Sequence, residues 1–159
     1  MIILGIDPGA SGGFAIVSHD LSSVNVIAYA KMTPHDIVEV LRPAKITKAY
    51  IEGVGAMPGQ GVVSVWKFGQ NFGWWLGVLT ALGIPFEKVQ PLKWQTAMRC
   101  RTGGDKNVSK AKAQELFPRV KMTHALADAL LIAEYGRRAE YKEALRCLVC
   151  KTSKASYGR

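Results

Sequence analysis

The chain begins Met1-Ile-Ile-Leu-Gly-Ile-Asp7-Pro-Gly9, and this stretch decides how we expect the rest to fold. Residues 2–6 form an apolar run of the length of a buried strand. The run ends in an acid, Asp7, and then in a Pro-Gly turn signal. A carboxylate at the edge of a core has a desolvation cost that a cation would offset. The alternative is that Asp7 merely caps the turn. Whether Asp7 binds a cation or only caps the turn depends on the acids found in the rest of the chain.

Four more strands and five helices are predicted from the patterns that follow. Strands are expected at residues 13–17, 24–30, 46–52 and 84–89. Helices are expected at residues 34–41, 63–82, 92–98, 110–117 and 123–135, with Thr33, Ser109 and Thr123 as N-caps. We therefore predict a single α/β domain over residues 1–143, followed by a basic, irregular tail over residues 144–159.

Two further acids lie where ionisation has a desolvation cost similar to that of Asp7. Glu52 ends the strand expected at 46–52 and is followed by glycine. If this strand is a parallel neighbour of the first, the two carboxylates lie side by side at the strand ends, where open α/β sheets bind ligands. Asp128 lies among apolar positions of the last helix, one turn after His124. A lone His-x-x-x-Asp pair is more often a local hydrogen bond. The positions of all three acids are explained more simply if the acids meet at one site in the fold.

Converging carboxylates repel one another unless a cation joins them. Hard divalent cations prefer oxygen ligands, and Mg²⁺ is usually held by a few carboxylates, water and substrate phosphate. Two such ions about 3.5–4 Å apart can activate a water molecule and stabilise the leaving oxygen of a phosphodiester. The three acids thus indicate a metal-dependent hydrolase acting on phosphodiesters.

The charge is unevenly distributed along the chain. Residues 1–98 carry 7 Lys/Arg and 6 Asp/Glu, a net charge of +1, whereas residues 99–159 carry 14 and 6, a net charge of +8. A basic half of this kind is typical of a protein that binds a polyanion, and nucleic acid is the first candidate. The alternative is a basic surface without a specific ligand.

No signal peptide or membrane span is predicted. The first apolar run is only as long as a strand, and Lys67, Gln70 and Asn71 interrupt the most apolar long window. The three cysteines are interpreted as reduced thiols, because the Cys147-x-x-Cys150 pair lacks a second pair to complete a zinc site. We expect a cytoplasmic protein.

Three glycines recur every four residues in the long apolar helix. Gly69, Gly73 and Gly77 therefore share one face, although each costs about 1 kcal/mol relative to alanine. A flat face that admits another backbone would offset this cost. It either packs on the protein's own sheet or contacts a second copy of the chain, and we favour the second interpretation.

The motifs Ile-Asp7-Pro-Gly, Ile-Glu52 and His124…Ala-Asp128-Ala-Leu, in this order, resemble those of the RuvC family of Holliday junction resolvases. The resemblance covers roughly residues 1–138. It is supported by Lys67-Phe-Gly-Gln-Asn-Phe-Gly73, which is similar to the family's dimer helix, and by the basic segment before the final helix. It implies a ribonuclease H-like fold, with a central mixed five-stranded sheet flanked by helices. It also implies a homodimer that makes paired nicks across a four-way DNA junction with Mg²⁺ or Mn²⁺, two ions per active site.

Residue by residue, the resemblance implies that Asp7 bridges the metals and that Glu52 and Asp128 complete the cage. The fourth position is an acid or a histidine in the family. Here it is His124, four residues before Asp128 where three is commoner. His124 either ligates a metal, which favours Mn²⁺, or orients the attacking water.

The resemblance and the charge distribution place DNA phosphates near the basic segment. The residues expected there are Lys106, Lys110 and Lys112, with Arg101 and Lys67 as further contacts. The family's wedge aromatic is missing: Gly55 stands at that distance, and the nearest bulky residues are Met57 and Trp66. This loop departure and the short chain favour a bacteriophage enzyme acting in the host cytoplasm.

Three other functions compete with junction resolution. The first is a ribonuclease H-like nuclease on flaps, unbranched DNA or RNA–DNA hybrids. The second is an inactive junction-binding module, which the intact set of acids disfavours. The third is a fragment of an actin-like phosphotransferase, which also has Asp-x-Gly after a first strand but needs a second nucleotide-binding half that 159 residues do not hold.

Overall fold

The computed structural model describes residues 1–53, 55, 59, 61–101 and 103–156, with side chains as far as Cys147. The strands are β1 (Ile2–Asp7), β2 (Gly13–Ser18), β3 (Val24–Ala28), β4 (Lys48–Glu52) and β5 (Phe86–Val89). The helices are α1 (Pro34–Leu41), the short 3₁₀ helix η1 (Arg42–Ala44), α2 (Val62–Ala81), α3 (Pro91–Met98), α4 (Lys106–Leu116) and α5 (His124–Ser156). Every strand and every α-helix predicted from the sequence is therefore present.

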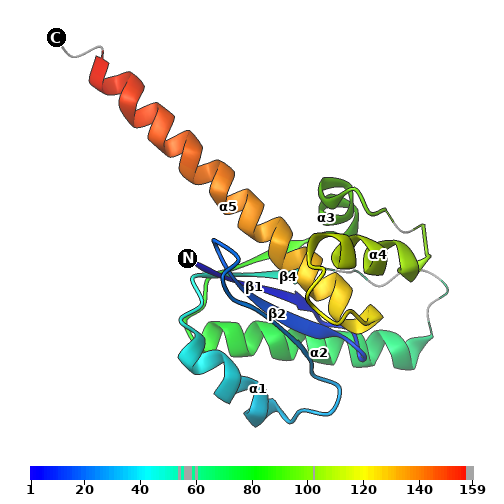
Figure 1. Ribbon diagram of the computed structural model, residues 1–159. Helices are drawn as coiled ribbons and strands as arrows, with labels where there is room; N and C mark the ends of the chain where they lie inside the picture. The colour runs from blue at the N-terminus through cyan, green and yellow to red at the C-terminus, as the bar shows by residue number, and fades with distance from the viewer. Residues whose placement is uncertain (54, 56–58, 60, 102, 157–159) are drawn as a thin grey trace.

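The strands form one mixed sheet in the order β3-β2-β1-β4-β5 (Figure 1). β1 and β4 run parallel, as do β4 and β5, whereas β2 is antiparallel to both β1 and β3. The predicted central mixed five-stranded sheet flanked by helices is confirmed. The parallel pair β1–β4 matters most for function, because both strands end in an acid at the same edge of the sheet.

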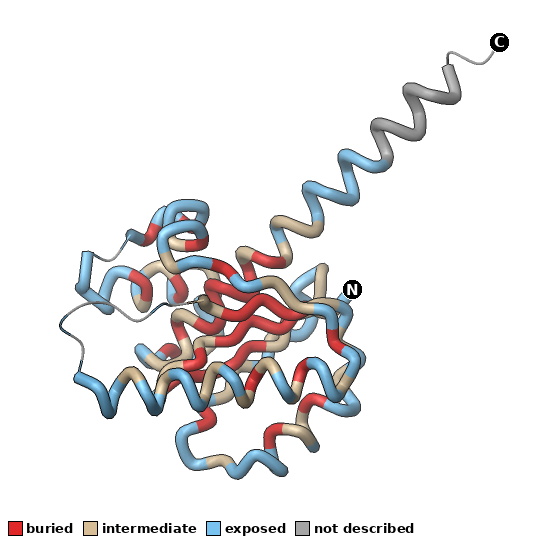
Figure 2. Tube along the Cα trace, turned by 180° about the vertical axis from the view of Figure 1, so that it is seen from behind, coloured by how far each residue is buried: buried red, intermediate tan, exposed pale blue. Residues whose placement is uncertain are grey.

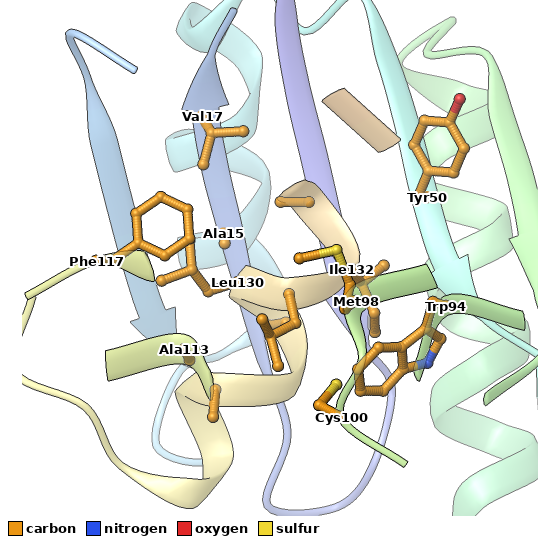
Figure 3. Packing of buried hydrophobic residues seen from close by; sticks show 14 of the residues in the cluster. Ala15, Val17, Tyr50, Trp94, Met98, Cys100, Ala113, Phe117, Leu130 and Ile132 are labelled. Carbon is orange, nitrogen blue, oxygen red and sulfur yellow. The ribbon is translucent and has the colours of Figure 1, made fainter. Parts of the chain in front are cut away.

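Helices cover both faces of the sheet (Figures 1 and 2). α1 and α2 pack on one face, where Trp75 and Leu79 of α2 are completely buried against β1, β2 and β4. α3, α4 and α5 pack on the other face. There Trp94, Met98 and Cys100 lie beneath α5, as Figure 3 shows. The sheet is thus the middle of three layers, with an apolar core on each side.

The backbone of α5 crosses β1 at closest range above Gly5. A Cβ atom added to Gly5 would lie 2.3 Å from the Ala133 nitrogen and 2.4 Å from the Ala129 oxygen. Only glycine fits at such a close approach. The small residue at this position therefore sets how near the last helix lies to the first strand.

A buried acid on α5 fastens the helix to the β2–β3 hairpin. The Glu134 carboxylate is 2% exposed. It accepts hydrogen bonds from Arg137 at 2.6 and 2.9 Å and from Arg138 at 2.6 Å, while Arg137 also donates to the His19 carbonyl at 3.0 Å. Burial alone would raise the pKa of Glu134, but the two guanidinium groups outweigh burial and lower it.

Two boundaries differ from the prediction by more than two residues. α5 remains helical to Ser156 and its last turns project away from the body (Figure 1), so the expectation of an irregular chain after Glu143 is wrong. The functional boundary at residue 143 stays a prediction. α4 starts at Lys106 rather than Lys110, because Asp105 is its N-cap and accepts from the Asn107 N–H at 2.9 Å. Ser109 lies inside the helix and is buried.

In the part of the chain that the structure describes, no helix has both the length and the apolar character that a membrane crossing requires. The described cysteines, Cys100 and Cys147, are free thiols, the first buried and the second exposed. The side chain of Cys150 lies outside the described residues.

We predict that Gly5→Ala destabilises the protein by about 1–3 kcal/mol or more, because α5 must move to admit the methyl group. Urea denaturation measures the loss. Gly55→Ala is the matched control, since Gly55 is exposed and an added methyl group would meet nothing within 4 Å. Equal stabilities for Gly5→Ala and the wild type would contradict the close crossing.

Candidate active site

Asp7 and Glu52 end two neighbouring parallel strands. The register pairs Ile6 of β1 with Ile51 of β4, so the acid that follows each of them lies at the same edge of the sheet. The Asp7 carboxylate accepts a hydrogen bond from the Gly9 N–H at 3.0 Å, and Glu52 accepts one from the Trp94 indole at 2.9 Å. The predicted side-by-side arrangement of the two acids is confirmed.

Asp128 reaches the same edge from α5. Its charge raises the pKa of Asp7 and of Glu52, so the three carboxylates lie within electrostatic range of one another. Its Oδ1 atom is buried and has no hydrogen-bond partner. The structure therefore brings together the three acids that the sequence singled out, from β1, β4 and α5.

All three acids hold their protons more tightly than usual. Burial is the main cause of the raised pKa of Asp7, Glu52 and Asp128. For Glu52, burial and the charges of the other two acids outweigh the Trp94 hydrogen bond and raise the pKa to about 7. The site is thus poised for a cation, which would stabilise the ionised forms.

One cation from the protein already acts on the site. Lys106, at the start of α4, lowers the pKa of each of the three acids against the effect of burial. It also lines an open cavity of about 670 Å³ together with Gly9 and Ser11 of the Asp7 loop and Lys67 of α2. Two of the lysines predicted to contact DNA therefore border the same cavity beside the acids.

The donor set fits a hard divalent cation. The three carboxylates supply oxygen ligands of the type that Mg²⁺ prefers, and the unpartnered Asp128 Oδ1 is free to accept a metal. Among the described residues, no three His, Cys, Asp or Glu side chains are close enough to form a ready-made metal cluster. Metal binding would therefore have to draw the carboxylates together.

The comparisons with known proteins agree with this geometry. The chain is 34% identical over 93 residues to the chloroplastic Holliday junction resolvase MOC1 of Chlamydomonas reinhardtii, a match that covers 55% of this chain and 10% of that protein. The chain thus spans about a tenth of the length of this curated relative. No protein-family model matches the chain.

Two solved structures are similar over most of their length. RuvC of Thermus thermophilus in complex with a Holliday junction superposes with a TM-score of 0.67 at 19% identity, covering 89% of this chain and 96% of that one. The fowlpox virus Holliday junction resolvase gives a TM-score of 0.54 at 13% identity, covering 87% and 99%. This chain has the fold of the RuvC-type resolvases. The ribonuclease H-like architecture implied by the motifs is therefore confirmed.

The remaining predicted site residues have different surroundings in this RuvC-type fold. His124 is the exposed first residue of α5, and its interaction with Asp128 lowers the pKa of that acid. Lys112 forms an ion pair with Glu115 at 2.8 Å. Lys110 is half-buried and Arg101 is exposed. A DNA-contacting role for these residues stays a prediction.

The loop after β4 holds no described aromatic residue. Gly55 is exposed, and Met57 lies outside the described residues. Trp66, in the first turns of α2, is 66% exposed, and Val65 and Phe68 beside it line the cavity near the acids. Of the two bulky residues noted in the sequence, Trp66 is thus the one that the structure describes, and its side chain is exposed without lining the cavity.

The glycine face of α2 packs against nothing in the described chain. Cβ atoms added at Gly69, Gly73 and Gly77 would meet no atom within 4 Å. The interpretation that these glycines pack on the protein's own sheet is therefore wrong. The three glycines thus form an exposed flat row on an otherwise apolar helix.

Three residues that support the acids are not evident from the sequence. Trp94 donates to Glu52 and Tyr29 contacts the Asp7 turn, but both partners are distant in sequence and leave no local pattern. Ser109 was assigned to a helix cap, whereas its buried hydroxyl interacts with Asp128 and lowers the pKa of that acid. Asp105 is the sequence signal that places Ser109 inside α4, because a helix capped by Asp105 begins before Ser109.

We predict that Glu52→Gln flattens the pH dependence of stability in the metal-free protein. A folded-state pKa of about 7 against an ordinary 4.5 means that the folded state binds the proton more tightly. The wild type therefore loses stability as the pH rises from about 4.5 to about 7. Urea denaturation in EDTA across this range should show a shallower decline for the variant. Identical slopes would contradict the raised pKa.

Proposed function

We propose that this protein is a metal-dependent endonuclease that resolves Holliday junctions or other branched DNA by paired phosphodiester hydrolysis. The observation that carries the proposal is the meeting of Asp7, Glu52 and Asp128 at one sheet edge of a RuvC-type fold. The sequence relationship to a Holliday junction resolvase supports the same activity. A nuclease of this kind needs acids that hold metal ions at a scissile phosphate, and three acids at one sheet edge could do so once a metal draws them together.

The chain's own residues would hold the metal and orient the substrate. We propose that Asp7, Glu52 and Asp128 would together hold two Mg²⁺ or Mn²⁺ ions, with Asp7 as the shared ligand. The ions would supply an activated water and charge stabilisation at the leaving oxygen. His124, at the exposed mouth of the site, would bind a metal or hold the attacking water. Before metal binding, Lys106 offsets part of the repulsion among the acids.

The substrate would approach along the basic side of the cavity. Lys67 and Lys106 line it directly, and we propose that Arg101, Lys110 and Lys112 extend the phosphate contacts. Trp66 is exposed and lies between Val65 and Lys67, which line the cavity, and we propose it as a surface on which an unpaired base could stack. We propose action on junctions ahead of flaps or RNA–DNA hybrids. Paired nicks in a junction require two copies of the site, and a dimer of this chain would supply them.

The homodimer would form through the glycine face of α2. The row of Gly69, Gly73 and Gly77 is open, and a second helix can approach it closely. We further propose a cytoplasmic location and a bacteriophage origin. The relative in Chlamydomonas is itself named as a chloroplastic protein.

We predict that Asp7→Asn and Asp128→Asn each abolish cleavage of a synthetic four-way junction while binding persists. Asparagine keeps the shape of the side chain but loses the charge that holds a metal. A gel assay with Mg²⁺, Mn²⁺ or EDTA, run beside linear duplex, flap and RNA–DNA hybrid substrates, measures both activities. Asp20→Asn is the control, because Asp20 is exposed on the β2–β3 hairpin and should leave cleavage unchanged.

Each outcome of this assay has a definite meaning. Symmetric, metal-dependent nicks in the junction alone support the proposed resolvase. Equal cleavage of flaps or hybrid would make the protein a general branch or RNA nuclease. Binding by the wild type without cleavage in either metal would indicate an inactive junction-binding module, and cleavage by the Asn variants would refute the assigned site.

We predict that Gly73→Leu converts the dimer to a monomer, because the added side chain holds the partner helix away. Sedimentation velocity measures the change, and paired nicking of the junction should fall with it. Ala111→Leu, on an exposed part of α4, controls for added surface bulk. A Gly73→Leu protein that remains dimeric would place the dimer contact elsewhere.

A further inference from the structure

Tyr29 contacts the turn that presents Asp7 although it lies 22 residues away along the chain. Its hydroxyl is 2.7 Å from the Gly9 carbonyl oxygen and 3.1 Å from the Asp7 carbonyl oxygen, and donates to both. Pro8 has no N–H to contribute within this turn. The Tyr29 hydroxyl therefore supplies from outside a donor that the turn itself lacks.

The backbone beside Tyr29 is fixed to the same loop. The Tyr29 N–H donates to the Gly12 carbonyl at 3.4 Å, and the Gly12 N–H donates back to Gly9 at 2.9 Å. Within the turn, the Gly9 N–H holds the Asp7 carboxylate at 3.0 Å. The position of this carboxylate thus depends on a short chain of hydrogen bonds that begins at Tyr29.

The tyrosine ring has little freedom to move. Tyr29 is 6% exposed and packs edge-on against Trp75 of α2, with ring centroids 5.5 Å apart. Trp75 is itself completely buried and packs edge-on against Phe14 of β2 at 5.7 Å. A donor held this firmly keeps its acceptors in one place, as a second layer of hydrogen bonds does around metal ligands.

We propose that Tyr29 is a positioning residue that holds the Asp7 carboxylate in place for metal binding. The proposal rests on the proposed function in taking Asp7 as a metal ligand. In the metal-free protein the charge of Asp128 acts on Asp7, and repulsion of this kind favours a turn that swings outward. The Tyr29 hydroxyl opposes that movement, so the first ligand is in position before the metal arrives.

The test compares Tyr29→Phe with Tyr50→Phe. Both remove one hydroxyl from a buried tyrosine, but Tyr50 donates to Glu140 on α5, away from the acids. Mn²⁺ binding to the intact protein is measured by isothermal titration without DNA, and junction cleavage is measured against Mn²⁺ concentration. Urea denaturation reports the stability of each variant.

We expect Tyr29→Phe to weaken Mn²⁺ binding about 10- to 100-fold, the range typical of residues that support metal ligands. Its cleavage rate should recover when Mn²⁺ is raised, while junction affinity stays the same. Tyr50→Phe should match the wild type in metal affinity whatever its stability. If Tyr29→Phe does not fold, Trp75→Phe is used instead, and a smaller loss of Mn²⁺ affinity is expected because the tyrosine ring is then less firmly held.

Unchanged Mn²⁺ affinity in Tyr29→Phe, or in Trp75→Phe where that variant replaces it, would overturn the positioning role. So would equal losses in Tyr29→Phe and Tyr50→Phe, which would indicate a general effect of stability. A wild type that binds Mn²⁺ but cleaves no junction would refute the proposed function and leave the Tyr29 test intact. A wild type that binds no Mn²⁺ would overturn both.

Discussion

The crossing of α5 over β1 is the contact on which the rest of the site depends. It requires a residue without a side chain at Gly5, since an added Cβ would lie 2.3 Å from the backbone of α5. A second glycine, Gly13, allows the same closeness at the start of the helix, where an added Cβ would lie 2.8 Å from the Ala125 oxygen. Asp128 stands between these two crossings. The helix therefore reaches the edge of β1 with its acid beside Asp7, and a bulkier contact would separate them.

Bringing the acids together has an electrostatic cost that the fold offsets in several ways. Burial raises the pKa of each of the three acids, which means that it disfavours their ionised forms. Single hydrogen bonds from Gly9 and Trp94 favour the charged forms of Asp7 and Glu52, and Lys106 acts on all three acids. The two apolar cores supply the stability that allows such a site to persist, as is common where function places charge in a costly position.

Much of this arrangement follows from the sequence because it depends on local patterns. Apolar runs identify the strands, and the rule that neighbouring parallel strands end at the same edge places Asp7 beside Glu52. What the sequence does not reveal depends on distant partners, on competing cap signals or on a helix that leaves the body of the protein. The bonds of Tyr29 to the Asp7 turn have no local signature, and the start of α4 was misplaced because two good capping residues, Asp105 and Ser109, stand four apart. The helical end of α5 lacks the periodicity of a packed helix because its last turns project from the body.

α2 carries both the proposed dimer contact and the support of the Asp7 turn. Successive residues of a helix are about 100° apart, so Trp75 points almost opposite to Gly73 and Gly77. One face of the helix is thus the open glycine row, and the other holds the ring of Tyr29 through Trp75. A second copy of the chain seated on the glycine row would press on the same rigid helix that steadies the Asp7 turn. Under the proposed function, assembly and order at the edge that holds the three acids would therefore be mechanically linked, as an enzyme that cuts two strands from two matching sites would require.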